Sequence, residues 1–376
     1  MSDCEGLTPV PFLDLRPSHE PLKAAIVAGL ADLIDRGAFT GGAEVGEFET
    51  AFASYCEAGA CVGVSSGLDA LRLALISAGA GPGSEVILPA QTFAATVESV
   101  IQAGAQPVLV DVTDADYNID PVAVEAAITP NTAFLLPVHL YGQMADMRAL
   151  GEIAGRHDLK IIEDGCQAHG ATRDGNRVGS AGLAAAFSFY PAKNLGAFGD
   201  AGACVTDDLE LAARVRALRE HGQPQKNVYE YVGYTARLDT LQALVLLHKL
   251  PLLDRWNEER RSAANFYSQS LEGLGDLVLP GVPEGSEPVW HLYVVRSKSS
   301  ARLAAFLRER QIGTGRHYPQ PLHVLPAYAD LGYAQGAFPN AEELAANGLS
   351  LPIFPGMKEA QLHAVLGAVA DFFARG

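Results

Sequence analysis

Between about residue 60 and residue 207, short apolar runs alternate with segments whose apolar residues recur at helical spacing. We expect strands at Ala60–Val64, Glu85–Pro89, Pro107–Val112, Ala133–Val138, Leu159–Glu163, Ala184–Phe189 and Gly202–Thr206. Helices are expected between them at Leu68–Ala78, Ala94–Ala103, Val122–Ile128 and Met147–His157. This alternation predicts an α/β fold in which helices cover both faces of a mostly parallel central sheet. Ligands bind such sheets outside the carboxyl ends of the strands.

The rest of the chain has a different pattern. Helical stretches at Leu238–Lys249 and from Leu252 to about Leu271 precede a segment rich in proline and glycine. A strand at Leu292–Val295 and helices at Ser300–Arg310 and Lys358–Phe373 then predict a smaller α+β unit. A length of 376 residues allows two or three domains. We therefore expect a large domain over residues 1–250 and a small C-terminal domain over residues 251–376.

Two residues with reactive side chains follow strands of the predicted sheet. Lys193 lies in an apolar context after the strand at Ala184–Phe189, and Asp164 closes the strand at Leu159–Glu163. A lysine in an apolar pocket has a lowered pKa and can act as a nucleophilic amine, although an isolated lysine is more often a surface residue. A carboxylate beside a pyridine nitrogen allows pyridoxal phosphate to work as an electron sink. The pair therefore predicts a pyridoxal-phosphate site.

Two turns after strands are candidates for holding the rest of this cofactor. In Ser66-Gly67-Leu68, small residues at a helix start let backbone N–H groups converge on an anion; a plain tight turn is the alternative. Ser188 is placed to donate to the same phosphate from a neighbouring strand end. Phe93 follows another strand, where an aromatic ring can stack on a planar cofactor, or belong to the core.

Polar side chains continue beyond Asp164. Gln167 is a candidate donor to the phenolic oxygen of the cofactor, and His169 is a candidate for a supporting contact or a buried structural histidine. Cys166 stands beside Asp164, which raises the question of a catalytic thiol, but small buried cysteines are common in protein cores.

The second half of the chain supplies the candidate substrate contacts. His317 and Tyr318 lie in a proline-stiffened segment that is suited to hydrogen-bonding a polar substrate. The spacing from His317 to His323 is not typical of a metal site and no acidic or cysteine ligand accompanies it, so no metal is expected. Arg237 is a candidate anion contact, with a surface arginine at a helix start as the alternative.

Charge and composition exclude several classes of protein. The formal net charge of −17 argues against a nucleic-acid binder, which usually carries a basic stripe. We expect neither a secretion signal nor a membrane span, because the sequence shows no basic region followed by an apolar stretch near residue 1 and no apolar run of sufficient length. The five cysteines (Cys4, Cys56, Cys61, Cys166 and Cys204) form no Cys-x-x-Cys pair, which indicates reduced thiols and a cytoplasmic protein.

Taken together, these segments resemble the sugar aminotransferases of the DegT/DnrJ/StrS family, which have the fold of aspartate aminotransferase (fold type I). The resemblance runs from Val10 to Pro352, and its most specific parts are Pro137–Gln143, Ile162–Gly170, the Lys193 segment and Arg237–Gln242. It implies that Lys193 forms a Schiff base with pyridoxal 5′-phosphate, that Asp164 pairs with the ring nitrogen and that Gln167 meets the phenolic oxygen.

The same resemblance implies the remaining contacts. Phe93 stacks on the ring, and the phosphate is held by Ser66, Gly67, Leu68 and Ser188. The family works as homodimers in which the partner chain completes each site. Two departures stand out: Leu68 replaces a threonine of many members, and Thr235 replaces an asparagine that reaches the phosphate of the partner's cofactor.

The resemblance is greatest to enzymes that transfer an amino group from L-glutamate to position 3 of a nucleotide-linked keto-deoxysugar, with dTDP or UDP as the nucleotide. The alternatives are the same chemistry at position 4 or on a cyclic ketone, and a regulatory protein that only binds pyridoxal phosphate. A nucleotide-dependent dehydrogenase would also explain the sheet, but the sequence lacks the glycine fingerprint of that class.

Overall fold

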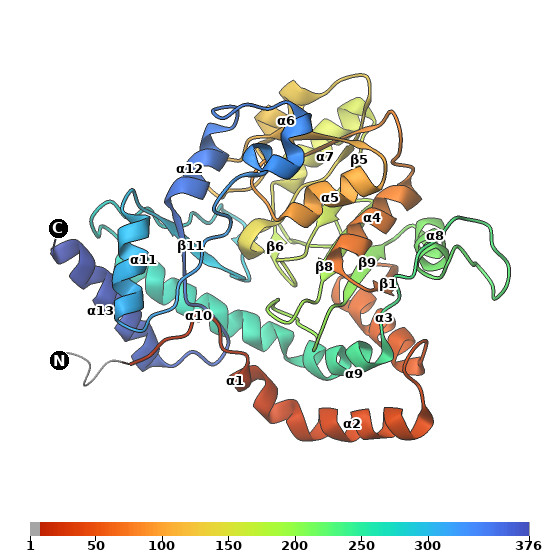
Figure 1. Cartoon of the computed structure of the whole chain (residues 1–376), viewed down its shortest axis with the longest axis horizontal. Coiled ribbons are helices and arrows are strands. Elements are labelled where there is room, and N and C mark those ends of the chain that lie inside the picture. The colour runs from red at the N-terminus through yellow and green to blue at the C-terminus, as the bar shows by residue number, and fades with distance from the viewer. Residues whose placement is uncertain (1–7, 376) are drawn as a thin grey trace.

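A computed structural model describes residues 8–375. Its centre is a seven-stranded sheet with the strand order β1-β9-β8-β5-β4-β2-β3 (Figure 1). The strands are β1 (Ala60–Val64), β2 (Glu85–Pro89), β3 (Gln106–Val110), β4 (Thr132–Leu135), β5 (Lys160–Asp164), β8 (Ala184–Ser188) and β9 (Gly202–Thr206). From β8 to β3 all neighbours are parallel, and only β9 runs antiparallel to its neighbours β8 and β1. The mostly parallel α/β sheet that the sequence predicts is confirmed.

Two layers of helices cover this sheet. One face packs on α4 (Gly67–Ala78), α5 (Ala94–Gln102) and α8 (Leu209–Arg219). The other packs on α3 (Ala43–Tyr55), α6 (Pro121–Ala127), α7 (Met147–His157) and α9 (Thr240–Lys249). Neighbouring strand residues alternate between the two layers, since Val86 and Leu88 join the first while Ile87 joins the second. Both faces are therefore buried, which is why the strands are apolar throughout.

The C-terminal part of the chain builds a third core around the antiparallel pair β11 (Tyr293–Arg296) and β12 (Gly348–Leu351). Its helices are α10 (Leu253–Leu271), α11 (Ser300–Glu309), α12 (Pro339–Asn347) and α13 (Glu359–Ala374). Val10 belongs to this core and pairs with Ile312, whereas Leu322 and Tyr328 pack on the core of the large sheet. Contacts thus cross residue 250 in both directions, and the boundary expected there stays a prediction.

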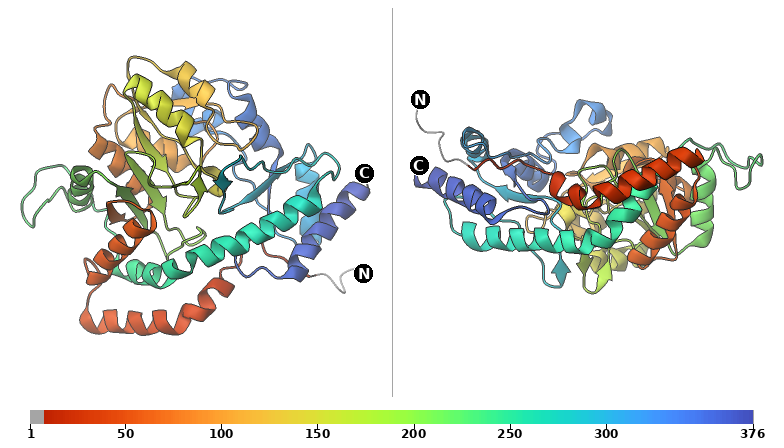
Figure 2. Two further views of the ribbon diagram at one scale, coloured as in Figure 1. Left: turned by 180° about the vertical axis from the view of Figure 1, so that it is seen from behind. Right: turned by 90° about the horizontal axis from the view of Figure 1, so that it is seen from below.

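The remaining elements are short or lie at the periphery. β6 (Thr172–Arg173), β7 (Asn176–Arg177) and β10 (Ser286–Glu287) form a small sheet. The N-terminal helices are α1 (Arg16–His19) and α2 (Lys23–Arg36), and the 3₁₀ turns are Glu20–Leu22, Leu140–Gly142, Leu250–Leu252, Leu322–Val324 and Pro326–Leu331. After α8 the chain forms a long loop that projects from the body in both views of Figure 2. No helix formed by the described residues has the length and apolar character needed to cross a membrane.

Candidate active site

The carboxyl ends of three strands meet at one edge of the sheet. Gly202, the first residue of the antiparallel strand β9, pairs with Val64 at the end of β1 and with Ser188 at the end of β8. Asp164 at the end of β5 pairs in turn with Ala186 of β8. The turn after β1, the acidic end of β5 and the loop after β8 therefore lie side by side, as the position of ligand sites in such sheets predicts.

Lys193 lies in the loop that follows β8. Its main-chain N–H donates to the carbonyl of Tyr190 at 2.8 Å, so the lysine sits within a tight turn. Its side chain is partly buried and its Nζ forms no hydrogen bond or ion pair with any residue from 8 to 375. Burial lowers the pKa of the Lys193 amine, while the nearby Cys166 and Asp164 counteract part of that effect. The amine is therefore available for covalent chemistry.

Asp164 is buried, with 4% of its surface exposed. Its Oδ2 accepts a hydrogen bond from the hydroxyl of Thr96 at 2.8 Å, and its Oδ1 accepts one from the main-chain N–H of Cys166 at 3.1 Å. Thr96 lies on α5, which begins just after Phe93. The two contacts together fix the orientation of the Asp164 carboxylate.

The turn that begins α4 is packed tightly against these groups. The hydroxyl of Ser66 accepts from the N–H of Asp69 at 3.1 Å and so caps the helix. A methyl group on Gly67 would come within 2.6 Å of Cβ of Ser188 and 2.8 Å of Sγ of Cys166. Only glycine fits there. The first N–H groups of a helix have no partner within it, so those of Gly67 and Leu68 are suited to bind an anion.

The candidate ring contacts come from three separate segments. Phe93 is 54% exposed, and the centre of its ring lies 5.7 Å from that of Tyr318. Gln167 donates from Nε2 to the hydroxyl of Tyr318 at 3.2 Å, and its Oε1 accepts from the N–H of Tyr141 at 2.8 Å. The structure thus brings Phe93, Gln167 and Tyr318 together, although they are far apart in the sequence.

The two other candidate substrate residues differ in their surroundings. His317 stacks on Phe12 with the ring centres 5.5 Å apart and contacts Ser350 Oγ at 2.8 Å. Burial and the charge of Lys193 lower the pKa of His317 to about 4. His317 therefore lies within the electrostatic influence of Lys193. Arg237 instead lies beside the end of β1 and pairs with Glu220 at 2.8 Å. No contact among the described residues joins it to His317 or Tyr318.

His291 and Thr96 at the site carry no clear signal in the sequence, whereas the sequence offers His169 as a supporting contact or a buried structural histidine. His291 is partly buried, its Nδ1 has no partner among the described residues, and burial together with Lys193 lowers its pKa well below the ordinary range. His169 is fully buried with both ring nitrogens unpartnered, and burial lowers its pKa to about 3. Thr96 lies one helical turn after Thr92, but nothing in the pattern points it toward Asp164.

These residues fit pyridoxal phosphate. The unpaired Lys193 amine suits the aldehyde, the hydrogen-bonded Asp164 suits the ring nitrogen, and the first N–H groups of α4 at the Gly67 turn suit a phosphate. Phe93, which is exposed next to Tyr318, suits the ring face. The chemistry of the donors therefore agrees with the cofactor that the sequence predicts.

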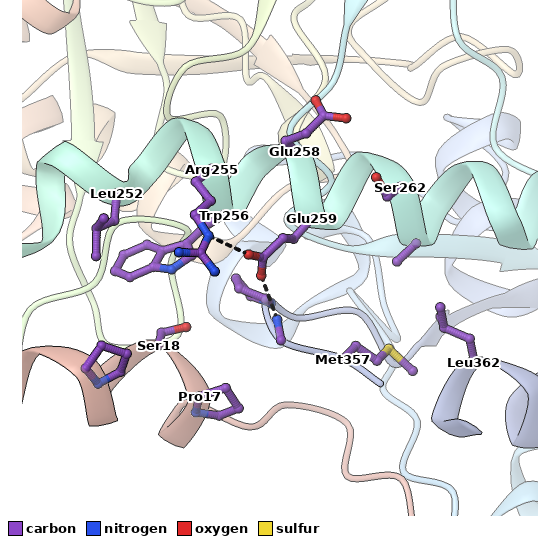
Figure 3. A pocket seen from close by; sticks show the side chains of 14 residues that line it. Pro17, Ser18, Leu252, Arg255, Trp256, Glu258, Glu259, Ser262, Met357 and Leu362 are labelled. Atoms are coloured by element: carbon purple, nitrogen blue, oxygen red, sulfur yellow. Dashed lines mark hydrogen bonds and ion pairs between the residues drawn. The ribbon is translucent and has the colours of Figure 1, made fainter. Parts of the chain in front are cut away.

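A cavity of about 560 Å³ lies away from the candidate site and is formed by α1, α10 and the segment before α13, with Trp256 and Met357 among its lining residues (Figure 3). Glu259 spans it by accepting from Arg255 at 3.0 Å and from the N–H of Gly356 at 2.9 Å. None of the candidate site residues lines this cavity. Its size alone does not make it the reactive centre.

Metal and thiol chemistry find no support in the described part of the chain. No group of three or more His, Cys, Asp or Glu residues is arranged there to hold a metal ion. Cys56, Cys61, Cys166 and Cys204 are free thiols, and Cys4 lies outside the described residues. Burial and the charge of Asp164 raise the pKa of Cys166, which disfavours the thiolate that a nucleophile needs.

Comparisons with known proteins show what the chain as a whole is similar to. The model of the DegT/DnrJ/EryC1/StrS aminotransferase family matches residues 21–370. The chain is 48% identical to a dTDP-3-amino-3,4,6-trideoxy-alpha-D-glucose transaminase of Streptomyces venezuelae, over 97% of each chain. It is 46% identical to a pleiotropic regulatory protein of Geobacillus stearothermophilus, over 97% of this chain and 98% of the relative. The crystal structure of DesV from S. venezuelae in complex with a ketimine intermediate superposes with a TM-score of 0.96 at 48% identity, covering 98% of this chain and 99% of that one.

Proposed function

Because the chain belongs to the DegT/DnrJ/EryC1/StrS aminotransferase family, we propose that it transfers an amino group from L-glutamate to the 3-keto carbon of a dTDP- or UDP-linked keto-deoxysugar. The chain is an aminotransferase that depends on pyridoxal 5′-phosphate. The nucleotide, the amino donor and the position of the new amine are the proposed parts. The observation that supports the position and the nucleotide is the match over 97% of the chain to a dTDP-3-amino-sugar transaminase, and the unpaired, partly buried amine of Lys193 supports the transfer itself.

The chemistry divides between the cofactor and the protein. Pyridoxal phosphate, when bound, supplies a carbonyl for the amine of Lys193 and a ring that accepts an electron pair. As general base, Lys193 is proposed to take the proton from the α-carbon of the amino donor. As general acid, it is proposed to deliver a proton to C4′ of the cofactor. Because the pKa of Lys193 is lowered, a larger fraction of its amine is unprotonated at a given pH. Asp164 is proposed to hold a proton on the ring nitrogen, and Thr96 keeps this carboxylate in place.

The remaining candidates form the proposed cofactor and substrate contacts. We assign the phosphate to Ser66, Gly67, Leu68 and Ser188, the ring face to Phe93, and the phenolic oxygen to Gln167. His317 and Tyr318 are proposed to orient the sugar, because both belong to the same hydrogen-bonded cluster as Gln167 and Tyr141. Arg237 is proposed to meet the diphosphate. This contact would require Arg237 to exchange its ion pair with Glu220.

We also propose that two copies of the chain associate and complete each other's sites. The loop that projects after α8 exposes Tyr229 and Val232, the latter to 94%. Tyr190 and Phe198, on either side of Lys193, expose more than two-fifths of their surface (55% and 46%). Large exposed apolar side chains, on the projecting loop and around Lys193, are typical of an interface. Thr235, at the end of the loop, is exposed and contacts His221 at 3.3 Å, and its role toward the partner's phosphate is part of this proposal.

An interface variant would test the shared site. A variant that carries Tyr229→Asp and Val232→Asp is the second variant beside Lys193→Ala; both are expected to be inactive, Lys193→Ala as a dimer and the second because it stays monomeric. Sedimentation of the second variant alone measures its assembly. A monomeric wild-type enzyme with full activity would exclude shared sites.

Free thiols at all four described cysteines and the nucleotide-linked substrate support a reaction in the cytoplasm. Expression with a fluorescent tag and cell fractionation would test this location.

A second candidate function is regulation. The relative from G. stearothermophilus is named a pleiotropic regulatory protein, and a regulator could bind pyridoxal phosphate without turning over a sugar. The free Lys193 amine next to Asp164 favours catalysis, since a sensor has no need of a proton carrier. The two functions differ in one measurement: only an enzyme converts glutamate to 2-oxoglutarate in the presence of a keto-sugar.

The deciding experiment incubates purified holoenzyme with glutamate and a panel of dTDP- and UDP-linked 3-keto- and 4-keto-deoxysugars, together with a cyclic ketone. We expect amination at position 3, detected by mass spectrometry and located by NMR. Amination only at position 4 or on the cyclic ketone would replace the proposed substrate. The absence of turnover with every acceptor would favour the regulatory function.

A further inference from the structure

The loop that carries Lys193 is fastened by side chains from two helices. Asn194 donates from Nδ2 to Oδ1 of Asn257 on α10 at 2.9 Å, and the main-chain N–H of Phe198 donates to Oε1 of Gln242 on α9 at 2.8 Å. Between these two points, the carbonyl of Gly196 accepts a hydrogen bond from the ammonium of Lys249, the last residue of α9. The loop that carries Lys193 is therefore held at Asn194, Gly196 and Phe198.

Lys249 is an unusual residue for such a place. It is 3% exposed, and no carboxylate within residues 8–375 forms an ion pair with it. Its other polar neighbour is Nε2 of His19 at 3.2 Å, and the rings of Phe198 and Trp256 lie 5.7 and 5.8 Å from its Nζ. Burial lowers its pKa to about 8. A buried cation without a counter-charge costs stability, so a purely structural position would be filled more favourably by an apolar side chain.

The carbonyl of Gly196, which accepts the hydrogen bond from Lys249, belongs to a tightly packed turn. A methyl group at Gly196 would come within 2.4 Å of the carbonyl oxygen of Pro191, so the two ends of the turn touch. Lys193 lies between them, and its own N–H is used by the Tyr190 carbonyl at 2.8 Å. Fixing the Gly196 carbonyl therefore fixes the main chain from which the Lys193 side chain extends.

We propose that Lys249 is a positioning residue for Lys193, holding the catalytic loop through the Gly196 carbonyl. This inference rests on the proposed function of Lys193. Lys249 takes no part in the proton transfers. It sets the angle and distance at which the Lys193 amine meets the cofactor and the reacting carbon, and small displacements of a catalytic group have large effects on rate.

The test replaces Lys249 by methionine. Methionine has a similar length, removes the charge, and makes favourable sulfur contacts with aromatic rings such as those of Trp256 and Phe198, so Lys249→Met is expected to fold. The matched control is Lys160→Met. Lys160 Nζ also donates to a main-chain carbonyl, that of Ala78, at 2.7 Å, and lies 5.7 Å from the ring of Phe134. Unlike Lys249, Lys160 is exposed, and it begins β5 at the end opposite Asp164. Lys249→Gln, which keeps a neutral donor, serves as the conservative variant.

Two readouts on the holoenzymes separate positioning from structure. In Lys249→Met, kcat is expected to fall about 10- to 100-fold, the range for the loss of a hydrogen bond from a charged donor, while KM for both substrates stays within about threefold. Hydrogen exchange of the amides of Lys193 and Phe198 is expected to become about tenfold faster or more. Lys249→Gln should recover part of both losses, and Lys160→Met should match the wild type.

Unchanged kcat and unchanged exchange at the loop in Lys249→Met would overturn the proposal, as would equal losses in Lys160→Met. A fall in melting temperature with kcat intact would assign Lys249 a structural role only and would also overturn it. The hydrogen-exchange outcome does not require turnover, so it tests the positioning of the loop even if the proposed reaction fails, and that failure would appear as absence of turnover in the wild-type enzyme itself.

Discussion

The hydroxyl of Thr96, on α5, donates a hydrogen bond to Oδ2 of Asp164, at the end of β5, over 2.8 Å. Both residues are buried, and the sequence separates them by 68 positions. Thr96 Oγ1 also contacts the hydroxyl of Thr92 at 3.0 Å, which links the segment that carries Phe93 to the same carboxylate. One threonine thus joins the proposed ring-stacking turn to the proposed partner of the ring nitrogen.

Thr96→Val should weaken the site without unfolding the protein. Valine keeps the shape of threonine but removes the donor, and a hydrogen bond to a charged group contributes about 1.5–3 kcal/mol. We expect pyridoxal phosphate to dissociate about 10- to 100-fold more readily, as measured by equilibrium dialysis followed by absorbance. Ser99→Ala is the control, because Ser99 lies one turn further along α5 and its hydroxyl donates to the main-chain carbonyl of Thr96, at 2.7 Å, and to no other residue that the structure describes. Equal affinities in wild type and Thr96→Val would contradict the role given to this contact.

Gly67→Ala should damage the phosphate turn. The added methyl group would come within 2.6 Å of Ser188 and 2.8 Å of the sulfur of Cys166, and crowding of this kind destabilises proteins by about 1–3 kcal/mol. Urea unfolding should show this loss, and cofactor affinity should fall with it. Gly46→Ala on α3 is the control, since a methyl group there meets no atom within 4 Å and raises helix propensity. If Gly67→Ala bound the cofactor as the wild type does, this turn would not be the phosphate site.

The stability of the protein should depend on pH through Lys249. Its pKa is about 8 in the folded chain against an ordinary value of 10.5, so between these two values the unfolded chain holds more protons and stability rises with pH. The Lys249→Met variant has no titrating group at this position. Its free energy of unfolding should therefore exceed that of the wild type by the largest amount below pH 8, where the wild type buries a charge. This difference should shrink by up to about 3 kcal/mol toward pH 10.5. His19, the titratable neighbour of Lys249, has a pKa lowered to about 4 and stays neutral throughout this window. Urea unfolding of both proteins at pH 7 and pH 10 measures the difference; an advantage that did not change would mean that Lys249 is not a buried charge.

The sequence predicts the central sheet well because its strands are short, apolar and separated by helices with clear periodicity. The bounds of β1, β2 and β9 agree with the expected ones, and the other strands differ by one to three residues at their ends. β4 ends at Leu135 instead of Val138, because the chain beyond it pairs with Asp164 only through a single bridge at Val138. The antiparallel direction of β9 has no signal in its composition.

Other elements could not be predicted from local pattern. α8 lies between β9 and the projecting loop and alternates arginines with small residues, so its apolar face is weak. The two-residue strands β6 and β7 form a short hairpin, and β10 pairs with β6 across more than 100 residues, Ser286 with Arg173. Val10 joins the C-terminal core for the same reason: tertiary contacts decide its place, and its neighbours in sequence do not.

The candidate site likewise contains residues that the sequence predicts and residues that it does not. Lys193, Asp164 and the Gly67 turn follow strands, so the topology of the sheet brings them together as the sequence predicts. Their supporting residues have no such rule. Lys249 resembles the charged end of an amphipathic helix, and only the packing of α9 against the Lys193 loop shows that it is buried.

Reduction of the holoenzyme with borohydride, followed by peptide mapping, tests the central claim most directly, because it fixes the cofactor to whichever amine holds it. We expect one labelled peptide, with pyridoxyl phosphate on Lys193 and none in Lys193→Ala. A label on another lysine, or a wild-type enzyme that remains unlabelled while it binds the cofactor, would contradict the site described above.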